Sequence, residues 1–232
     1  PKEIIKQFAE DNGAVIPDSV FLTWGGGSGQ GYTYSIARDM VVMPNGDVSF
    51  ICILQDYFVT TEVPEEQRFR KVVEIYRESG AWGIREIASM PTTTFLLYIN
   101  ADNEGHNQMV FEFQISRSVD GEYLIAKWLQ TFFWEVEGID DPVSSTDIMF
   151  AVRRAGEDKW SAPEQLTETF EIDRLTWIPN LVPNDLKNIP LLKVMTKPDP
   201  DINEGDLIAQ RANQLMIEVP QHVMMGHFDG SI

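Results

Sequence analysis

Short apolar runs separated by glycine-containing turns are the feature that most constrains the fold of this chain. In the segment ARDMVVMPNGDVSFICILQ, two such runs flank Asn45-Gly46. Asn-Gly supplies the positive φ angles of a tight β-hairpin, so residues 38–55 are predicted to form two antiparallel strands. Similar hairpins are predicted around Gly80 and Gly121. The fold is therefore predicted to be all-β.

One short helix is predicted ahead of the strands. Ile4, Ile5 and Phe8 recur at helical spacing in PKEIIKQFAEDNGA, and Gly13 ends the pattern. The glycine-rich run 25–31 precedes strand-like residues and not an apolar helix, so it is interpreted as a flexible surface loop and not as a phosphate-binding loop. The predicted organisation has three segments: the helix and glycine-rich loop (1–31), a β-repeat body (32–196), and an acidic loop with a C-terminal strand or tail (197–232).

The charge balance limits the partners that this chain can bind. Its 232 residues carry 36 acidic and 18 basic side chains, which gives a formal net charge of −18. Such a chain repels phosphate groups, so we expect neither nucleic acid nor an anionic membrane surface as a partner. No apolar run reaches the roughly 18 residues of a membrane-spanning helix, so membrane insertion is not expected. Cys52 is the only cysteine, which excludes an intrachain disulfide, and its apolar neighbours predict burial.

Three arginines mark a repeat in the body of the sequence. Arg77, Arg117 and Arg154 each stand just before a turn, at intervals of 40 and 37 residues. Trp82 and Trp160 open the return segment after two of these turns. A period near 40 with about four strands per unit is typical of β-propeller blades. We therefore predict a β-propeller-like array of antiparallel four-stranded sheets, wedged together by tryptophan, with a two-sheet β-sandwich as the alternative.

The hairpin DIMFAVRRAGEDKWSAPEQL, residues 147–166, resembles the repeats of bacterial β-propeller proteins of the WD40-like and sialidase-type (BNR) families. Those repeats often read as an apolar run, Ser-Arg or Arg-Arg, a Gly/Asp turn and Trp-Ser-x-Pro. The segment SRSVDGEYL is similar to their Asp-box: it has Ser118, Asp120 and Gly121, but Leu124 stands where the box has tryptophan. VVMPNGDVSFI is similar to the hairpin that opens such a blade. The resemblance implies stacked blades.

The leading functional hypothesis is a non-catalytic extracellular or periplasmic binding or assembly module that recognises a glycan or a protein partner. Consecutive aromatic residues in a strand cannot all face the same side, so at least one of Phe132, Phe133 and Trp134 is available as a contact unless both faces of the strand are buried. The candidate ligand-binding residues are Arg77, Arg117, Arg154, Phe133 and Trp134.

Two alternative functions stay open. A sialidase-like glycoside hydrolase would need an arginine cluster and a Tyr–Glu pair, and Glu74 and Tyr76 share one face of a predicted strand. Half-buried strands carry such pairs routinely, however. The second alternative is a structural subunit of a larger extracellular assembly.

Two C-terminal segments carry residue types that bind metals. Oxygen-bearing side chains alternate in KPDPDINEGD as calcium loops require, but Glu204 stands where an EF-hand has glycine, and a solvated acidic linker is the alternative. The candidate calcium ligands are Asp199, Asp201, Asn203 and Asp206. Imidazole and sulfur near the C-terminus suit copper or haem iron, with packing of an apolar tail as the alternative; these residues are His222, Met224, Met225 and His227.

Overall fold

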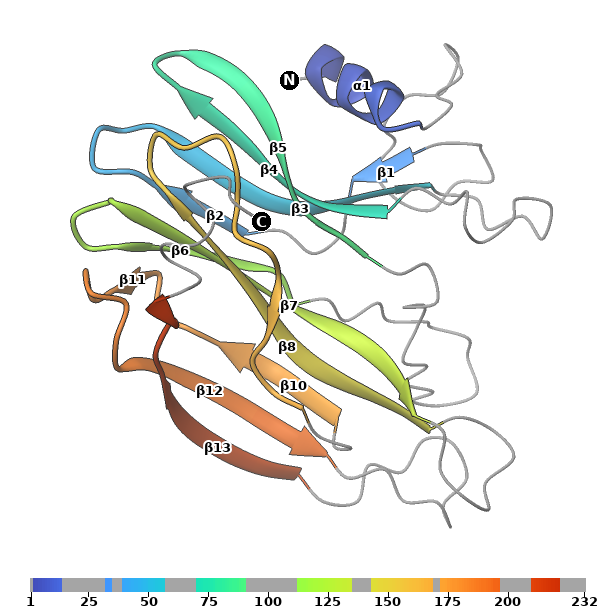
Figure 1. The fold of residues 1–232 in the computed structure, drawn as a ribbon, viewed down its shortest axis with the longest axis vertical. Coiled ribbons are helices and arrows are strands. Elements are labelled where there is room, and N and C mark those ends of the chain that lie inside the picture. The colour runs from blue at the N-terminus through green and yellow to red at the C-terminus, as the bar shows by residue number, and fades with distance from the viewer. Residues whose placement is uncertain are drawn as a thin grey trace, which may run out of the picture.

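The computed structural model of the protein describes residues 2–13, 32–34, 39–56, 70–90, 112–134, 143–168, 172–196 and 210–221. Strands dominate these ranges, and one short helix precedes them, so the predicted all-β class is confirmed (Figure 1). The helix is α1 (Lys2–Asp11), and the strands are β1 (Tyr32–Tyr34), β2 (Asp39–Val42), β3 (Val48–Asp56), β4 (Arg70–Glu78), β5 (Ala81–Ser89), β6 (Gln114–Ser118), β7 (Tyr123–Trp134), β8 (Val143–Arg154), β9 (Glu164–Gln165), β10 (Ile172–Trp177), β11 (Leu181–Val182), β12 (Ile189–Thr196) and β13 (Gln210–Ile217).

The strands form two hydrogen-bonded sheets. A five-stranded sheet has the order β1-β3-β4-β5, with β2 also paired to β3. An eight-stranded sheet has the order β11-β6-β7-β8-β10-β12-β13, with β9 also paired to β8. Neighbours pair antiparallel, except that β10 runs parallel to β8 and β11 parallel to β6. One residue pair, Thr146 with Ile172, joins β8 to β10, and the eight-stranded sheet folds over at this narrow connection.

The described strands therefore stack as three layers, as Figure 1 shows. We call β2–β5 the first layer, β6–β8 the middle layer, and β10, β12 and β13 the third layer. Two separate apolar cores fill the spaces between them. Face-to-face packing of sheets buries the apolar side of each without helices.

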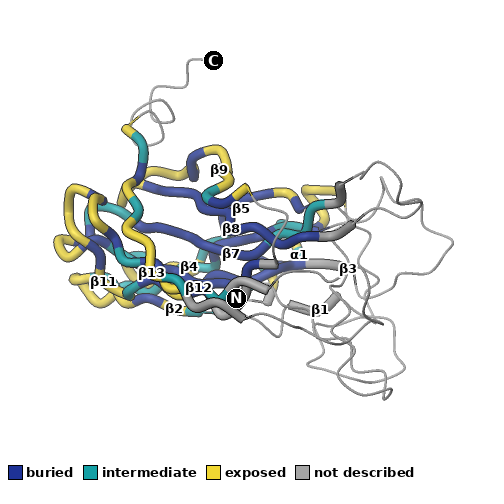
Figure 2. The backbone as a smooth tube through the Cα atoms, turned by 90° about the horizontal axis from the view of Figure 1, so that it is seen from below, coloured by how far each residue is buried: buried dark blue, intermediate teal, exposed yellow. Residues whose placement is uncertain are grey.

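The middle layer is buried on both faces. Leu124 and Trp128 of β7 face the first layer, where they pack in one core with Ile51 and other residues of β3–β5. Ile125 and Leu129 alternate with them and face the third layer. Figure 2 shows β7 and β8 as buried along most of their described length, in contrast to the exposed turns. A strand buried on both faces is apolar nearly throughout, which accounts for the run YLIAKWLQTFFW.

Charged side chains also lie between the layers. Lys127 of β7 is 2% exposed and donates hydrogen bonds to the carbonyl and the Oγ1 of Thr176, at 2.8 Å and 2.5 Å. Burial lowers the pKa of Lys127 to about 8, because removal from water disfavours the charged ammonium. In the third layer, Lys193 Nζ lies 2.7 Å from a carboxylate oxygen of the fully buried Asp173. The hydrogen bonds of Lys127 thus join the middle layer to the third layer in addition to apolar packing, and the Lys193–Asp173 pair joins β12 to β10 within the third layer.

Helix α1 covers part of the outer face of the first layer. Its spacing places Ile5 and Ala9 on one side, where they pack on Cys52, Leu54 and Val73. Cys52 is 4% exposed, which confirms the prediction that it is buried.

The predicted hairpins are confirmed, with one change at the first turn. We expected positive φ angles from both residues of Asn45-Gly46, but of the two only Gly46 adopts one, at 86°. The reason is that the loop has three residues and not two: Met43 N donates to Asp47 O at 2.8 Å, which closes a loop of residues 44–46. The β4–β5 turn is a two-residue turn, with φ values of 51° at Ser79 and 84° at Gly80.

The tryptophans of the predicted repeat occupy different environments. Trp160 is 4% exposed, and its Nε1 donates to Glu74 at 2.9 Å. Trp82 is 36% exposed and stacks on Phe50, with 6.2 Å between ring centroids. The prediction that both indoles wedge one layer onto the next is therefore wrong for Trp82. The three stacked layers agree with the general prediction that sheets stack on one another. The finer prediction, a closed ring of four-stranded blades, is not seen in the described ranges.

Two further features bear on the predicted boundaries. Pro190 lies within β12, where it pairs with Met216, although proline lacks the N–H that a central strand position uses. In the described residues, pairing of β12 with β10 begins at Leu192, so Pro190 lies beyond these pairs. β13, from the predicted C-terminal segment, pairs with β12 along its whole length.

The described part of the chain contains no helix that is long and apolar enough to cross a membrane.

Candidate functional site

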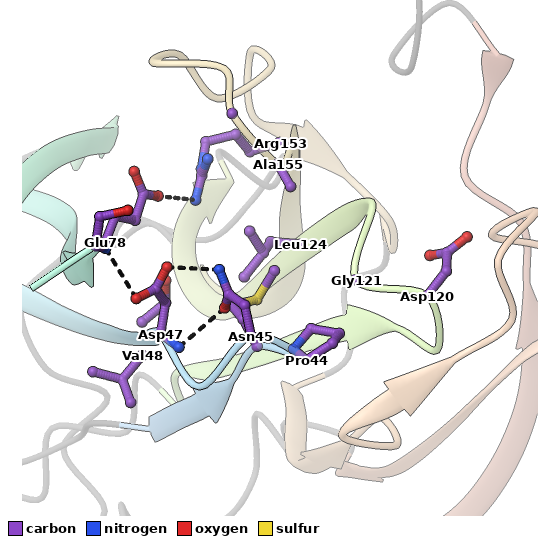
Figure 3. Close-up of a pocket in the computed structure, with 14 residues that line it drawn as sticks. Pro44, Asn45, Asp47, Val48, Glu78, Asp120, Gly121, Leu124, Arg153 and Ala155 are labelled. Carbon is purple, nitrogen blue, oxygen red and sulfur yellow. Dashed lines mark hydrogen bonds and ion pairs between the residues drawn. The ribbon is translucent and has the colours of Figure 1, made fainter.

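A cavity of about 400 Å³ lies where turns of the first and middle layers meet (Figure 3). We call it the turn-end cavity. Four turns line it: the β2–β3 turn (43–47), the β4–β5 turn (79–80), the β6–β7 turn (119–122) and the turn that follows β8 (155–157). Segments more than 100 residues apart in the sequence thus share one site.

The β2–β3 turn is held by its own side chains. Asn45 Nδ2 donates to Asp47 Oδ2 at 2.8 Å, and the backbone N of Asp47 donates to Asn45 Oδ1 at 3.0 Å (Figure 3). Asn and Asp favour turns because their short side chains bond to nearby backbone groups in this way. Asp47 Oδ1 also accepts a hydrogen bond from the backbone N of Ser79 at 3.0 Å. One carboxylate therefore fixes the β2–β3 and β4–β5 turns to each other.

The β6–β7 turn is organised around Asp120. Its Oδ1 accepts hydrogen bonds from Ser118 Oγ at 2.6 Å and from the backbone N of Glu122 at 2.9 Å. The hydrogen bond from Ser118, and then that from Glu122, lowers the pKa of Asp120 below its ordinary value, so this carboxylate is ionised at neutral pH. Gly121 adopts a φ of 77°, and a Cβ there would lie 2.5 Å from Pro44 Cδ. The Asp-box-like residues Ser118, Asp120 and Gly121 therefore build the turn and bring it against the β2–β3 turn.

A buried ion-pair cluster lies beneath the cavity. Arg153 of β8 is 1% exposed, and its Nη2 lies 2.8 Å from Glu74 Oε1 and 3.8 Å from Glu78 Oε1. Glu74 has no exposed surface; it also accepts hydrogen bonds from Ser49 Oγ at 2.6 Å and from Trp160 Nε1 at 2.9 Å. This cluster joins β3 and β4 of the first layer to β8 of the middle layer, and it gives the cavity a rigid floor.

The lining of the cavity defines the ligand chemistry that it can accept. Asp47, Glu78 and Asp120 are the acidic residues of the lining, and their carboxylates accept hydrogen bonds, while Pro44 and Leu124 add apolar surface. The acidic lining repels anions, and the net charge of −18 does so at longer range. The arrangement suits a neutral or cationic ligand that donates hydrogen bonds.

The predicted binding arginines all stand beside turns, as expected, but the cavity lining contains none of the three. Arg117 lies in β6, and its Nε donates to the carbonyl of Val42 at 2.8 Å. Arg154 pairs with Glu122 at 2.5 Å on the surface. Arg77 is exposed, opposite Val48 and Trp82 in the sheet. Each arginine thus has its own surroundings, and a role of any of them in ligand binding stays a prediction.

The predicted aromatic contacts lie at the other end of the middle layer. β7 runs from Tyr123, beside the turn-end cavity, to Trp134, which pairs with Val143. A strand rises about 3.3 Å per residue, so Phe133 and Trp134 lie roughly 30 Å or more from the cavity. Their side chains fall outside the described part of the structure, and their proposed role stays a prediction.

Both predicted metal sites lie outside the described residues. This applies to Asp199, Asp201, Asn203 and Asp206, and also to His222, Met224, Met225 and His227. Among the residues that the structure does describe, no group of three or more His, Cys, Asp or Glu side chains is placed to hold a metal ion. Calcium binding by the acidic loop stays a prediction.

Glu74 and Tyr76, the candidate nucleophile pair of the hydrolase hypothesis, have other contacts. Both oxygens of Glu74 are engaged inside the ion-pair cluster. The ring of Tyr76 lies under the guanidinium of Arg85, 3.5 Å from its centre, and fills the space that Gly83 leaves, where a Cβ would come within 2.1 Å of the ring. These contacts hold the two residues as internal packing and charge partners.

A second hollow, of about 710 Å³, lies between β5 and residues 158–163. Arg85 lines it and is 8% exposed. Its guanidinium is already close to carboxylates, 3.1 Å from Glu78 and 3.4 Å from Asp158. The positive charge of Arg85 is therefore compensated from within the protein.

Asn45, Asp47, Ser79 and Arg153 were not among the predicted site residues. The first three were identified in the sequence only as parts of turns. A turn predicts its own conformation but not which other turns it will meet. The sequence offered one indication, the residue types at the turns. Asn, Asp and Ser at turn positions have polar side chains that can form hydrogen bonds to their own turn or to other groups.

No protein-family model matches the sequence, and no curated protein matches it significantly.

Proposed function

We propose that the protein is a non-catalytic binding module and that it holds a neutral glycan in the turn-end cavity. The observation that carries the proposal is the meeting of four turns, from two layers, around one cavity of about 400 Å³. Sites for small ligands commonly have volumes of roughly 300–1,000 Å³. Binding residues are often found on loops that a rigid scaffold positions.

The chemistry of the lining supports a sugar over other ligands. Asp47 and Asp120 offer carboxylates that accept hydrogen bonds from sugar hydroxyls, and Pro44 and Leu124 offer apolar contact to the C–H face of a ring. An acidic sugar is disfavoured because its own carboxylate would be repelled by these side chains. Arg153 is the one cation in the described lining of the cavity, and it is buried and already paired with Glu74. This contrast favours a binding module for neutral glycans over a sialidase-like hydrolase.

The rigidity of the turns supports a preformed site. Asn45, Asp47 and Ser79 are linked by hydrogen bonds that do not involve a ligand. A site that is already ordered loses little conformational entropy when a ligand binds, so more of the contact energy is available as affinity.

The fold and the sequence resemblance together support the architectural part of the proposal. We infer that the three stacked layers belong to a β-propeller-like stack, in which loops at one end of successive sheets form the binding surface. A glycan ligand agrees with the extracellular or periplasmic location that we predict for this module.

A glycan array carrying neutral and sialylated glycans tests the proposal. We expect saturable binding of neutral glycans and no binding of sialylated ones. Ala155 is exposed and lines the cavity, so Ala155→Trp is expected to fill it and to weaken binding by about tenfold or more. Ala162→Trp is the matched control, because Ala162 is also exposed but lies on the second hollow.

Several outcomes would count against the proposal. Absence of glycan binding, or equal binding by wild type and Ala155→Trp, would remove the turn-end cavity as a glycan site. Turnover of fluorogenic glycosides would favour the hydrolase alternative. Specific retention of a protein partner in place of any glycan would favour the assembly alternative.

A further inference from the structure

The outer face of the third layer exposes large apolar side chains. Trp177 is 46% exposed, Leu192 is 44% exposed and Met216 is 58% exposed. They come from the three strands of this layer, β10, β12 and β13. Single exposed apolar residues are normal on protein surfaces, but a group of them on one sheet face marks an interaction surface.

Strand register shows that these side chains share one face. Trp177 is the direct partner of Leu192, and Pro190 is the direct partner of Met216. Directly paired residues in antiparallel strands point to the same side of the sheet. Leu191, which alternates with Leu192, is fully buried against the middle layer. The exposed group therefore faces away from the molecule.

The described outward positions of β12 and β13 carry no charge. They are Pro190, Leu192, Val194, Gln214 and Met216. The chain as a whole carries a net charge of −18, so most of its surface would repel a second copy. On this face two copies can approach without bringing carboxylates together. The register partner of Val194 in β10 is Arg174.

We propose that the outer face of the third layer is a self-association surface, and that its occupant is the same face of a second copy of this chain. The molecule already contains two interfaces of this type, because the first, middle and third layers pack sheet against sheet through apolar side chains. The proposed dimer adds one more sheet-on-sheet interface. We call this surface the third-layer face.

The strand order allows the third-layer face to meet itself about a two-fold axis. β12 lies between β10 and β13 in the sheet order. A two-fold axis along β12 exchanges the two flanks, so Trp177 of one copy lies over β13 of the other, and Leu192 of each copy lies near the axis. Isologous two-fold contacts of this kind are the commonest form of homodimer, and they close without forming a fibre.

Analytical ultracentrifugation of the full chain over the micromolar range tests this inference. We expect a concentration-dependent rise in mass from 26.4 kDa toward twice that value. Salt is expected to strengthen the dimer, because it screens repulsion between the two acidic chains. Leu192→Glu places a charge in the apolar contact and is expected to weaken the dimer by about 100-fold or more.

The control is the same substitution at an exposed leucine elsewhere. Leu181 of β11 is 49% exposed, and Leu181→Glu is expected to leave the dimer unchanged. Circular dichroism checks that both variants keep their strands. A wild type that stays at 26.4 kDa throughout the range would overturn the proposal, as would a dimer that both variants weaken equally or that neither variant weakens. Glycan binding by the turn-end cavity does not depend on this result.

Discussion

Arg153 Nη2 lies 2.8 Å from Glu74 Oε1, although the two residues come from different sheets and lie 79 positions apart in the sequence. Neither side chain has more than 1% of its surface exposed. A buried pair of this type does not by itself raise stability, because both charges lose their hydration. It does specify one arrangement of the two layers, since any other arrangement would leave one of the charges buried and without its partner.

Loss of Arg153 is expected to be far more costly than loss of its neighbour. Arg153→Met leaves Glu74 buried with its charge weakly compensated, and removing one partner of a buried pair typically costs about 3–5 kcal/mol. Arg154 pairs with Glu122 at the surface, where its side chain is 51% exposed, so Arg154→Met is expected to cost about 1 kcal/mol or less. Urea denaturation of both variants measures the difference. Equal losses of unfolding free energy would show that the cluster does not hold the layers together.

Two glycines on the turn-end cavity are expected to respond differently to alanine. Both adopt positive φ angles, 77° at Gly121 and 86° at Gly156, which costs an L-residue about 1–2 kcal/mol. A Cβ at Gly121 would also lie 2.5 Å from Pro44 Cδ, whereas one at Gly156 would meet nothing within 4 Å. Gly121→Ala is therefore expected to cost about 1–3 kcal/mol more than Gly156→Ala in thermal or urea unfolding. Matching costs would contradict the close approach of the β6–β7 and β2–β3 turns.

Lys127 predicts a specific pH dependence of stability. Its pKa is lowered to about 8 in the folded protein, mainly by burial, from an ordinary value of 10.5. Between these two pH values the unfolded chain binds more protons than the folded chain, so the free energy of unfolding rises with pH in this window. The full difference corresponds to the order of 3 kcal/mol. Below pH 8 Lys127 is charged in the folded chain as well as in the unfolded chain, so the full free-energy cost of burying this charge lowers the stability of the protein.

The variant Lys127→Met isolates this effect. Other groups titrate above pH 9, so the relevant quantity is the difference in unfolding free energy between wild type and variant at each pH. We expect wild type to gain stability relative to Lys127→Met from pH 8 to 10.5. A difference that does not change over this range would mean that Lys127 is not desolvated.

The hairpins could be predicted from the sequence because turn chemistry is local. Asn45, Gly46, Ser79 and Gly80 determine nearby backbone angles, and the strands around them form as expected. The exact loop at Gly46 differs because two loop lengths accept the same Asn-Gly pair. The short helix was equally predictable, since Ile5 and Phe8 lie on its packed side.

The stacking of the layers could not be read from the sequence with the same accuracy. It depends on which face of each strand meets which sheet, and strands buried on both faces have no alternating pattern to show this. Arg153 and Arg154 illustrate the limit: they are adjacent and chemically identical, yet one is buried in the ion-pair cluster and the other is half exposed. Likewise, Trp82 and Trp160 follow similar turns but differ in burial: Trp160 packs in the core between the first and middle layers, whereas Trp82 stacks on Phe50 and is 36% exposed.

The candidate site was the least predictable part of the protein. The sequence directed attention to Arg77, Arg117 and Arg154, which do stand beside turns. The cavity itself is lined by the turns, and its position follows from contacts such as that between Asp47 and Ser79, 32 residues apart. Contacts of this range depend on which hairpins pair with each other and on how the layers pack, so local patterns do not reveal them.

The most direct test of the account is a titration of the isotope-labelled protein with a neutral glycan selected on the array, followed by amide NMR spectra. We predict that the largest shift changes occur at the backbone amides of Asn45, Asp47, Ser79 and Gly121, which belong to three turns around one cavity. Changes confined to other regions, such as Phe133 and Trp134 at the far end of β7, would contradict the assignment of the turn-end cavity as the ligand site.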